Sequence, residues 1–279
     1  MKCVITAAGR GTRLLPFTKE LPKEMMPIFS KTQIREPVVV PLLQYIFEQL
    51  FEAGIREYCF VVGREKRSIE DHFTPHESYV NELSISNKAL ISDFYKKIEK
   101  SHLIWVNQNK PMGFGDAVKR AERFVGDDSF IVHAGDVSII SKSKIHPVVR
   151  LINEAKVDSS VSAVILCKKV KDTKRYGVPK IKKISSSTYL VEEVEEKPER
   201  PKSDFGILPI YFFRSKIFGS LKQIKTGKNK EYQLTDAIQN LIHNNEKVIM
   251  IPLRTDEIEI DVGTVGTYKQ ALEDSYKYA

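Results

Sequence analysis

The segment CVITAAGRGTR, residues 3–13, sets the expectation for the fold. Cys3–Ala7 is a short apolar run, the pattern of a buried β-strand, and a glycine-rich loop follows it directly. Similar runs, such as Tyr58–Val62 and Phe130–His133, alternate with helical segments, such as the amphipathic Pro41–Ala53 and the segment Gly115–Val125. Strands that alternate with helices in this way predict a parallel sheet covered by helices on both faces.

The later part of the chain shows a different pattern of apolar runs and turns. Apolar or alternating runs separated by short turns predict antiparallel strands, at Ser160–Lys169, Val178–Ile184, Tyr189–Val194 and Gly206–Phe213. Two further helices are expected, over Leu234–Asn244 with Thr235 near its cap and over Val265–Tyr276. The sequence shows no internal repeat, and no linker separates two folding units, so we expect one domain over residues 1–279.

The composition is that of a globular protein with a large core. Of 279 residues, 42% are hydrophobic and 29% are charged, which does not suit a disordered chain. No apolar run approaches the roughly 20 residues of a membrane-spanning helix, and Cys3–Ala8 is too short for a signal peptide. With Lys+Arg 44 against Asp+Glu 36 the net charge is +8, but the charges are interspersed. We therefore expect neither a membrane nor a nucleic acid as partner.

The cysteines Cys3, Cys59 and Cys167 lie far apart and form no C-x-x-C pair. This spacing predicts neither a disulfide framework nor a zinc site. Cys3 and Cys59 stand in strand-like runs, where cysteine acts as a small hydrophobic residue. A reducing compartment, the cytoplasm, fits this pattern best.

The loop after the first strand is the strongest candidate for a binding site. It carries small residues and donors, with a second cation further on: Ala8, Gly9, Gly11, Thr12, Arg13 and Lys23. Small residues let backbone N–H groups approach an anion closely. The loop lacks the lysine of a Walker A motif and the third glycine of a dinucleotide fingerprint. The plain alternative is an ordinary turn with surface cations, but two cations in one loop that prolines make rigid favour phosphate binding.

This loop and the run Pro22–Pro27 (PKEMMP) resemble the signature of the sugar-1-phosphate nucleotidylyltransferases, most closely the UTP–glucose-1-phosphate uridylyltransferase branch. The resemblance recurs in order along nearly the whole chain, at Gln108–Ala117, Gly135–Asp136, Arg175–Val178, Glu196–Pro198, Tyr232–Ala237 and Asp261–Gly263. It implies a Rossmann-like α/β fold with a mixed, mainly parallel central sheet and an antiparallel sugar-binding excursion. The implied halves bind the nucleotide (about 1–140) and the sugar phosphate (about 141–265), before a C-terminal helix (about 265–279).

The resemblance also implies which residues hold the nucleotide. In the family, the residues matching Gln108 and Gly113 contact the base, which suggests a pyrimidine. Carboxylates at the positions of Asp136 and Asp261 hold Mg²⁺ against the phosphates, and oxygen ligands with retained waters are what Mg²⁺ prefers. An aspartate after a strand is otherwise as well explained as the cap of a turn.

For the sugar phosphate, the resemblance implies a second group of residues. The resemblance implies that Glu196 accepts hydrogen bonds from sugar hydroxyls and that Lys197 binds the phosphate. The plain alternative is that both belong to a solvated acidic surface. Beside Tyr176, Gly177 lets a sugar lie against the backbone.

The implied reaction joins UTP and glucose 1-phosphate into UDP-glucose and pyrophosphate. The nucleophile is a phosphate with a second pKa near 6, so no general base is needed. We expect Arg13 to bind the β- and γ-phosphates and Lys23 to stabilise charge near the α-phosphate. His133 is expected in the core and the other histidines at the surface.

Two segments depart from the family pattern, Ser30–Pro41 and Ser203–Gly206, and the second leaves the identity of the sugar open. A nucleotidylyltransferase of another base or sugar, such as a thymidylyltransferase, is therefore an alternative. A non-catalytic sensor of nucleotide sugars is another, which loss of a carboxylate or cation would have favoured. The oligomeric state is not set by the sequence, and a homo-oligomer is left open.

Overall fold

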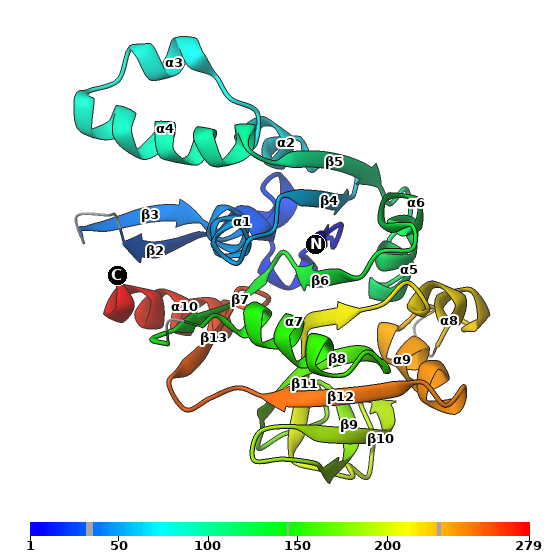
Figure 1. The fold of residues 1–279 in the computed structure, drawn as a ribbon. Helices are drawn as coiled ribbons and strands as arrows, with labels where there is room; N and C mark the ends of the chain where they lie inside the picture. Colours follow the sequence, from blue (N-terminus) through cyan, green and yellow to red (C-terminus); the bar gives the residue numbers. More distant parts are fainter. Residues whose placement is uncertain (32–35, 144, 228–229) are drawn as a thin grey trace.

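The computed structural model describes residues 1–31, 36–143, 145–227 and 230–279 (Figure 1). The main strands are β1 (Lys2–Ala7), β4 (Glu57–Val62), β5 (His102–Asn107), β6 (Phe130–Ala134), β8 (Val161–Lys169), β9 (Gly177–Lys183), β10 (Tyr189–Glu196), β11 (Phe205–Phe213) and β12 (Lys247–Pro252). Within the described ranges they form a nine-stranded sheet in the order β5-β4-β1-β6-β11-β8-β12-β10-β9.

The sheet is mixed but mainly parallel. Strands β5, β4, β1 and β6 pair parallel with one another, as does β12 with β8. Strand β11 is antiparallel to both β6 and β8, and β10 is antiparallel to both β12 and β9. Thus β11 and β10 alone among these strands run against the rest, which confirms the predicted sheet with an antiparallel excursion.

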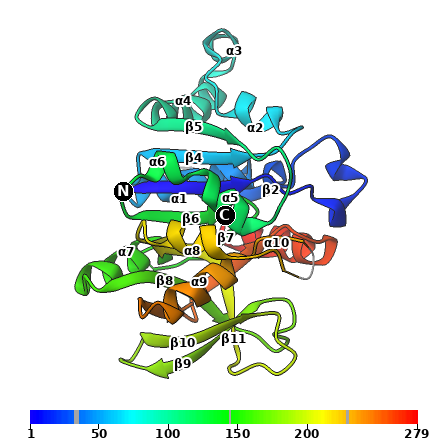
Figure 2. The ribbon, with the colours of Figure 1, turned by 90° about the vertical axis from the view of Figure 1, so that its right-hand side faces the viewer.

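Helices cover both faces of the sheet, as expected (Figures 1 and 2). The helices are α1 (Leu42–Glu52), α2 (Arg67–His72), α3 (Glu77–Asn81), α4 (Ile85–Glu99), α5 (Phe114–Arg120), α6 (Glu122–Val125), α7 (Pro147–Val157), α8 (Ile217–Gln223), α9 (Leu234–His243) and α10 (Val265–Tyr278). Cys3 and Ile5 of β1 pack in one core with α1, α4, α7 and α10. Val4 faces the other core, with α5, α6, α8 and α9. The alternation of β1 therefore divides the interior into two layers.

The antiparallel pairings outside the main sheet were not predicted. They are the hairpin of β2 (Pro27–Lys31) and β3 (Pro37–Pro41), and the ribbon of β7 (Val137–Ser141) and β13 (Glu257–Asp261). The hairpin accounts for the Ser30–Pro41 departure, although residues 32–35 lie outside the described part of the chain. Likewise, residues 228–229 of the loop after α8 lie outside it.

Several helix predictions need correction. Helices α3, α7 and α8 were missed, and the helix expected to run unbroken up to Val125 divides at Ala121 into α5 and α6. The helix α9 was expected to be capped by Thr235 or just before it; the cap position is Gln233, two residues earlier, and the Thr235 hydroxyl donates to Glu196. None of the described helices is long and apolar enough to cross a membrane.

Three histidines are held neutral inside the fold. His133 is buried, as expected, but His72 and His146 are also partly buried, so the expectation of surface positions is wrong for them. Burial lowers the pKa of His72 and of His133 to about 4, and that of His146 to about 3. In the unfolded chain these rings titrate near pH 6.5.

We expect the protein to lose stability as the pH falls from about 6.5 towards 4. In this window the unfolded chain takes up protons that the folded chain does not bind, so acid favours unfolding. The urea midpoint measured at pH 7.5 and at pH 5 tests this, with His72→Gln as the comparison. A His72→Gln variant that loses as much stability in acid as the parent would contradict the assignment for that ring.

Candidate active site

A cavity of about 870 Å³ opens at the carboxyl ends of β1 and β6. All the site residues proposed from the sequence line it: Ala8, Gly9, Gly11, Thr12, Arg13, Lys23, Gln108, Gly113, Asp136, Tyr176, Gly177, Glu196, Lys197 and Asp261. The carboxyl edge of strands in an open α/β sheet is where such folds bind ligands. The structure therefore brings together residues that lie far apart in the sequence.

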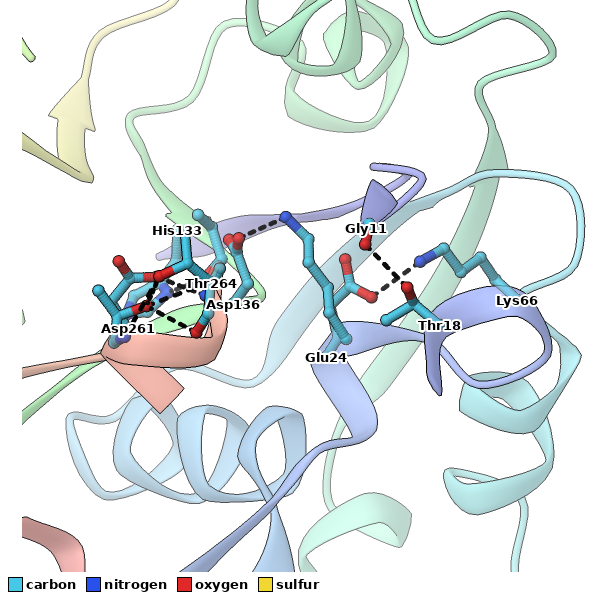
Figure 3. A network of polar contacts seen from close by, with 12 residues as sticks. Gly11, Thr18, Glu24, Lys66, His133, Asp136, Asp261 and Thr264 are labelled. Atoms are coloured by element: carbon cyan, nitrogen blue, oxygen red, sulfur yellow. Dashed lines mark hydrogen bonds and ion pairs between the residues drawn. The ribbon is translucent and has the colours of Figure 1, made fainter. Parts of the chain in front are cut away.

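The loop after β1 folds back on itself. Gly11 has φ 66° and its carbonyl accepts a hydrogen bond of 2.8 Å from the Thr18 hydroxyl (Figure 3). A Cβ on Gly11 would lie 3.1 Å from Thr18, so the left-handed turn and the close contact both require glycine here. A Cβ on Gly9 would lie 3.4 Å from Lys23 Nζ. The Lys23 ammonium is thus packed against the backbone of the loop.

Lys23 forms an ion pair with Asp136, and both side chains are largely buried. Burial alone would raise the pKa of Asp136, but the Lys23 ammonium outweighs it and lowers that pKa below its usual value. Burial alone would lower the pKa of Lys23, yet Asp136 and Glu24 raise it above its usual value. Both groups are therefore charged at neutral pH.

The ribbon of β7 and β13 brings the two aspartates together. Asp261 stands opposite Val137, and the Val262 amide donates to the Asp136 carbonyl over 3.1 Å. Asp261 Oδ1 accepts from the Gly263 amide over 2.7 Å, and α10 begins just beyond with a capping box at Thr264 (Figure 3). The ribbon therefore holds the backbones of both aspartates next to each other.

These two aspartates supply only part of a metal shell. Within the described ranges, no group of three or more His, Cys, Asp or Glu side chains is placed to hold a metal ion. A cation here would need further oxygen ligands from phosphates and water. This donor set suits Mg²⁺, which keeps waters and is bound through one or two carboxylates plus phosphates.

At another part of the cavity, Gln108 is buried and its amide is oriented by the protein. Its Nε2 donates to Asp116 Oδ2 over 2.7 Å and to the Gly113 carbonyl over 3.2 Å. Asp116 also accepts from Arg120 one helical turn later, over 3.0 Å. Asp116 was not singled out from the sequence, where an aspartate four residues before an arginine is typical of an exposed helix face.

Gly113 is held against the segment before α9. It has φ 103° and ψ 173°, and a Cβ there would lie 2.8 Å from the Tyr232 carbonyl. The Tyr232 amide donates to the Met112 carbonyl over 2.7 Å. The loop 111–115 therefore fits only with glycine at position 113.

Glu196 is positioned by neighbours from three segments. Thr235 donates to its Oε2 over 2.8 Å, and Lys197 lies 3.1 Å from its Oε1. A Cβ on Gly177 would lie 3.0 Å from the Thr235 hydroxyl and 3.3 Å from Glu196. The Lys197 amide donates to the Tyr176 carbonyl over 3.0 Å. From the sequence, Thr235 was expected near a helix cap and within a run that resembles the family. Its pairing with Glu196 was not predicted, because the partner lies 39 positions away.

Cations flank two carboxylates at the carboxyl edge of a parallel sheet, in one cavity with an oriented amide, an arrangement suited to a phosphorylated ligand. A family model described as nucleotidyl transferase matches residues 2–277 of the chain. The chain belongs to this family, and the protein is a nucleotidyltransferase.

Its relatives agree in sequence and in structure. A UTP–glucose-1-phosphate uridylyltransferase from Bacillus subtilis is 36% identical over 245 residues, which are 86% of this chain and 80% of the relative. The crystal structure of an apo UDP-glucose pyrophosphorylase superposes with a TM-score of 0.88 at 29% identity, covering 99% of this chain and 98% of that one. A UDP-glucose pyrophosphorylase complexed with UDP-glucose gives 0.85 at 29% identity, covering 100% and 99%.

Proposed function

We propose that this protein transfers the uridylyl group of UTP to glucose 1-phosphate, giving UDP-glucose and pyrophosphate. The observation that carries the proposal is the meeting of Lys23, Asp136 and Asp261 in one cavity with Gln108 and Glu196. The relatives described above are named for this reaction, and one of them was solved with UDP-glucose.

The main requirement of this reaction is that cations stabilise the negative charge of the phosphates. An oxygen of the sugar phosphate attacks the α-phosphorus of UTP in line, and the bond to the pyrophosphate oxygen breaks. Lys23 would stabilise the charge that builds on the α-phosphoryl group, and Arg13 would bind the departing β- and γ-phosphates. Lys197 would hold the sugar phosphate in place. No residue has to remove a proton, because the nucleophile is already ionised at neutral pH.

Asp136 and Asp261 would hold Mg²⁺, which neutralises phosphate charge when bound. Asp136 is kept ionised by Lys23, so its carboxylate is ready to act as a ligand at neutral pH. The second oxygen of Asp261, Oδ2, does not take part in the hydrogen bond from the Gly263 amide. The buried, free cysteines are consistent with a reducing compartment such as the cytoplasm.

The orientation of the Gln108 amide favours a nucleobase that carries a hydrogen-bond donor at N3. The hydrogen-bond network assigns Nε2 to Asp116 and Gly113, and no described residue donates to Oε1. Oε1 is then the atom offered to a ligand, and it can only accept. Uracil and thymine present an N3–H there, whereas cytosine presents an acceptor, so UTP and dTTP are favoured over CTP.

Gly113→Ala is expected to weaken nucleotide binding about tenfold or more. A side chain in this glycine-only backbone region costs roughly 1–3 kcal/mol, and 1.4 kcal/mol is tenfold in affinity. The loop 111–115 would relax away from Tyr232 and would have to be rebuilt on binding. Nucleotide titration monitored by calorimetry measures the change.

Gly126→Ala provides the control. Gly126 also has a positive φ, 61°, but a Cβ there meets nothing within 4 Å. This variant should lose some stability and keep its nucleotide affinity. Equal losses of affinity in the two variants would mean that general backbone strain, and not the base loop, is responsible.

The proposed function is tested by pyrophosphate release with Mg²⁺ across a grid of nucleotides and sugar 1-phosphates. The nucleotides are UTP, dTTP, CTP, GTP and ATP, and the sugars are glucose, galactose, N-acetylglucosamine and mannose. We expect turnover to be highest with UTP and glucose 1-phosphate. The highest turnover with another pair would agree with the mechanism but contradict the substrate assignment. No turnover with any pair would favour a sensor of nucleotide sugars.

A further inference from the structure

The loop 63–66, between β4 and α2, touches both ends of the segment 8–24. At one end, a Cβ on Gly63 would lie 3.0 Å from the Ala8 carbonyl, so the two backbones are in close contact. At the other end, Lys66 Nζ lies 2.8 Å from Glu24 Oε2 (Figure 3). Between them, Glu65 has φ 71°, a conformation that non-glycine residues rarely adopt. None of these contacts is explained by the proposed chemistry alone.

The Lys66–Glu24 pair is buried. The side chains of Lys66 and Glu24 are 8% and 1% exposed. Burying a charge pair is costly unless the geometry is good, so such pairs are weak candidates for simple stabilisation. Glu24 also packs under the turn that carries Asp136, since its Cγ would lie 3.1 Å from a Cβ on Gly135.

Glu24 has two cations around it. Burial raises the pKa of this carboxyl, and Lys66 and Lys23 oppose the effect in that order. Lys23 is the adjacent residue in the chain, and its ammonium is paired with Asp136 rather than with Glu24. One buried carboxylate therefore stands beside the cation that the proposed mechanism needs.

We propose that Lys66 is a positioning residue: by pairing with Glu24 it leaves Lys23 free to lie at Asp136 and to reach the α-phosphate. This inference rests on the role proposed for Lys23. Without Lys66, Glu24 would be a buried carboxylate with Lys23 as the remaining nearby cation, and an unpaired buried charge is strongly unfavourable. Lys23 would then turn towards Glu24 and away from the reacting groups.

The test compares Lys66→Met with the double variant Glu24→Gln/Lys66→Met. In Lys66→Met we expect kcat to fall by about 10²-fold, the loss that a misplaced catalytic group can cause, while KM for UTP and glucose 1-phosphate changes little. In the double variant the carboxylate that captures Lys23 is gone. We expect kcat to recover most of that loss.

Lys97→Met is the matched control. Lys97 is also a partly buried lysine, 18% exposed and paired with Glu48. Glu48 does not line the cavity, whereas Glu24, the partner of Lys66, does. This variant should lose stability and keep its kcat. Melting temperatures are measured for all variants, so that a loss of rate can be separated from a loss of fold.

Three results would overturn the inference: a Lys66→Met enzyme with the parent kcat, a rate loss that follows the melting temperature in every variant, or a folded double variant that stays as slow as Lys66→Met. If Lys66→Met does not fold, the double variant decides alone, since a folded double variant with low kcat contradicts the proposal. Failure of the proposed function is distinguishable, because the parent protein itself would then give no turnover.

Discussion

Lys23→Met is expected to lower kcat by about 10²–10³-fold, or about 3–4 kcal/mol of transition-state stabilisation. The ammonium is packed against the loop at Gly9 and held at Asp136, so it is placed before any substrate arrives. A charge that needs no rearrangement is worth most in the transition state. Steady-state rates with UTP and glucose 1-phosphate, measured on protein shown to be folded by circular dichroism, give the comparison.

Lys19→Met is the control for this experiment. Lys19 belongs to the same loop, but its side chain is 77% exposed and its ion pair with Glu20 lies at the surface. This variant should keep the parent kcat. If Lys23→Met were as active as Lys19→Met, the assignment of Lys23 to the reacting phosphate would be wrong.

Asp136→Asn is expected to lower kcat by a comparable factor, about 10²–10³-fold, and to raise the Mg²⁺ concentration needed for half-maximal activity. The change keeps the shape of the side chain but removes the charge that a divalent cation needs from its ligand. It also leaves Lys23 without its partner. Rates measured across a Mg²⁺ titration separate the effect on the metal from the effect on turnover.

Asp128→Asn is the matched control, since Asp128 also pairs with a lysine, Lys2, but is 65% exposed and outside the cavity. Its Mg²⁺ dependence should equal that of the parent. An Asp136→Asn protein with parent-like turnover and an unchanged Mg²⁺ requirement would contradict the proposed metal site.

Several strands of the main sheet, such as β1 and β4, could be predicted from the sequence because each is a short, mostly apolar run. Cys3–Ala7 and Tyr58–Val62 differ from β1 and β4 by one residue at the start. Buried strands of this kind carry their own signal, since both faces are covered. The segments that were missed give weaker signals: α8 has seven residues, and β7 directly follows a turn that already ends β6.

The members of the candidate site were predicted, but their arrangement was not. Asp136 and Asp261 were each visible as an aspartate after a strand, whereas the β7–β13 ribbon that unites them is a long-range pairing without a local pattern. The same holds for the partners that orient the site. Thr235 and Lys66 are ordinary residues in the sequence, and only the fold shows that they pair with Glu196 and Glu24.

The second segment that departs from the family pattern, Ser203–Gly206, has a clear structural role. Ser203 donates to the Pro179 carbonyl over 2.6 Å, and a Cβ on Gly206 would lie 2.7 Å from the Tyr176 ring. The segment therefore packs against Tyr176, which lines the cavity, and against strand β9. It carries no sequence signal for this role, because Pro179 and Tyr176 lie more than twenty positions away.

The uridylyl group of UTP, which carries the α-phosphorus, is expected to move to glucose 1-phosphate. The most direct measurement incubates the protein with Mg²⁺, glucose 1-phosphate and UTP labelled at the α-phosphorus, and follows the label by chromatography. The label is expected to appear in UDP-glucose, in equal amount to the pyrophosphate released, and only when glucose 1-phosphate is present. Label that stays in UTP, in folded protein that binds the nucleotide, would contradict it.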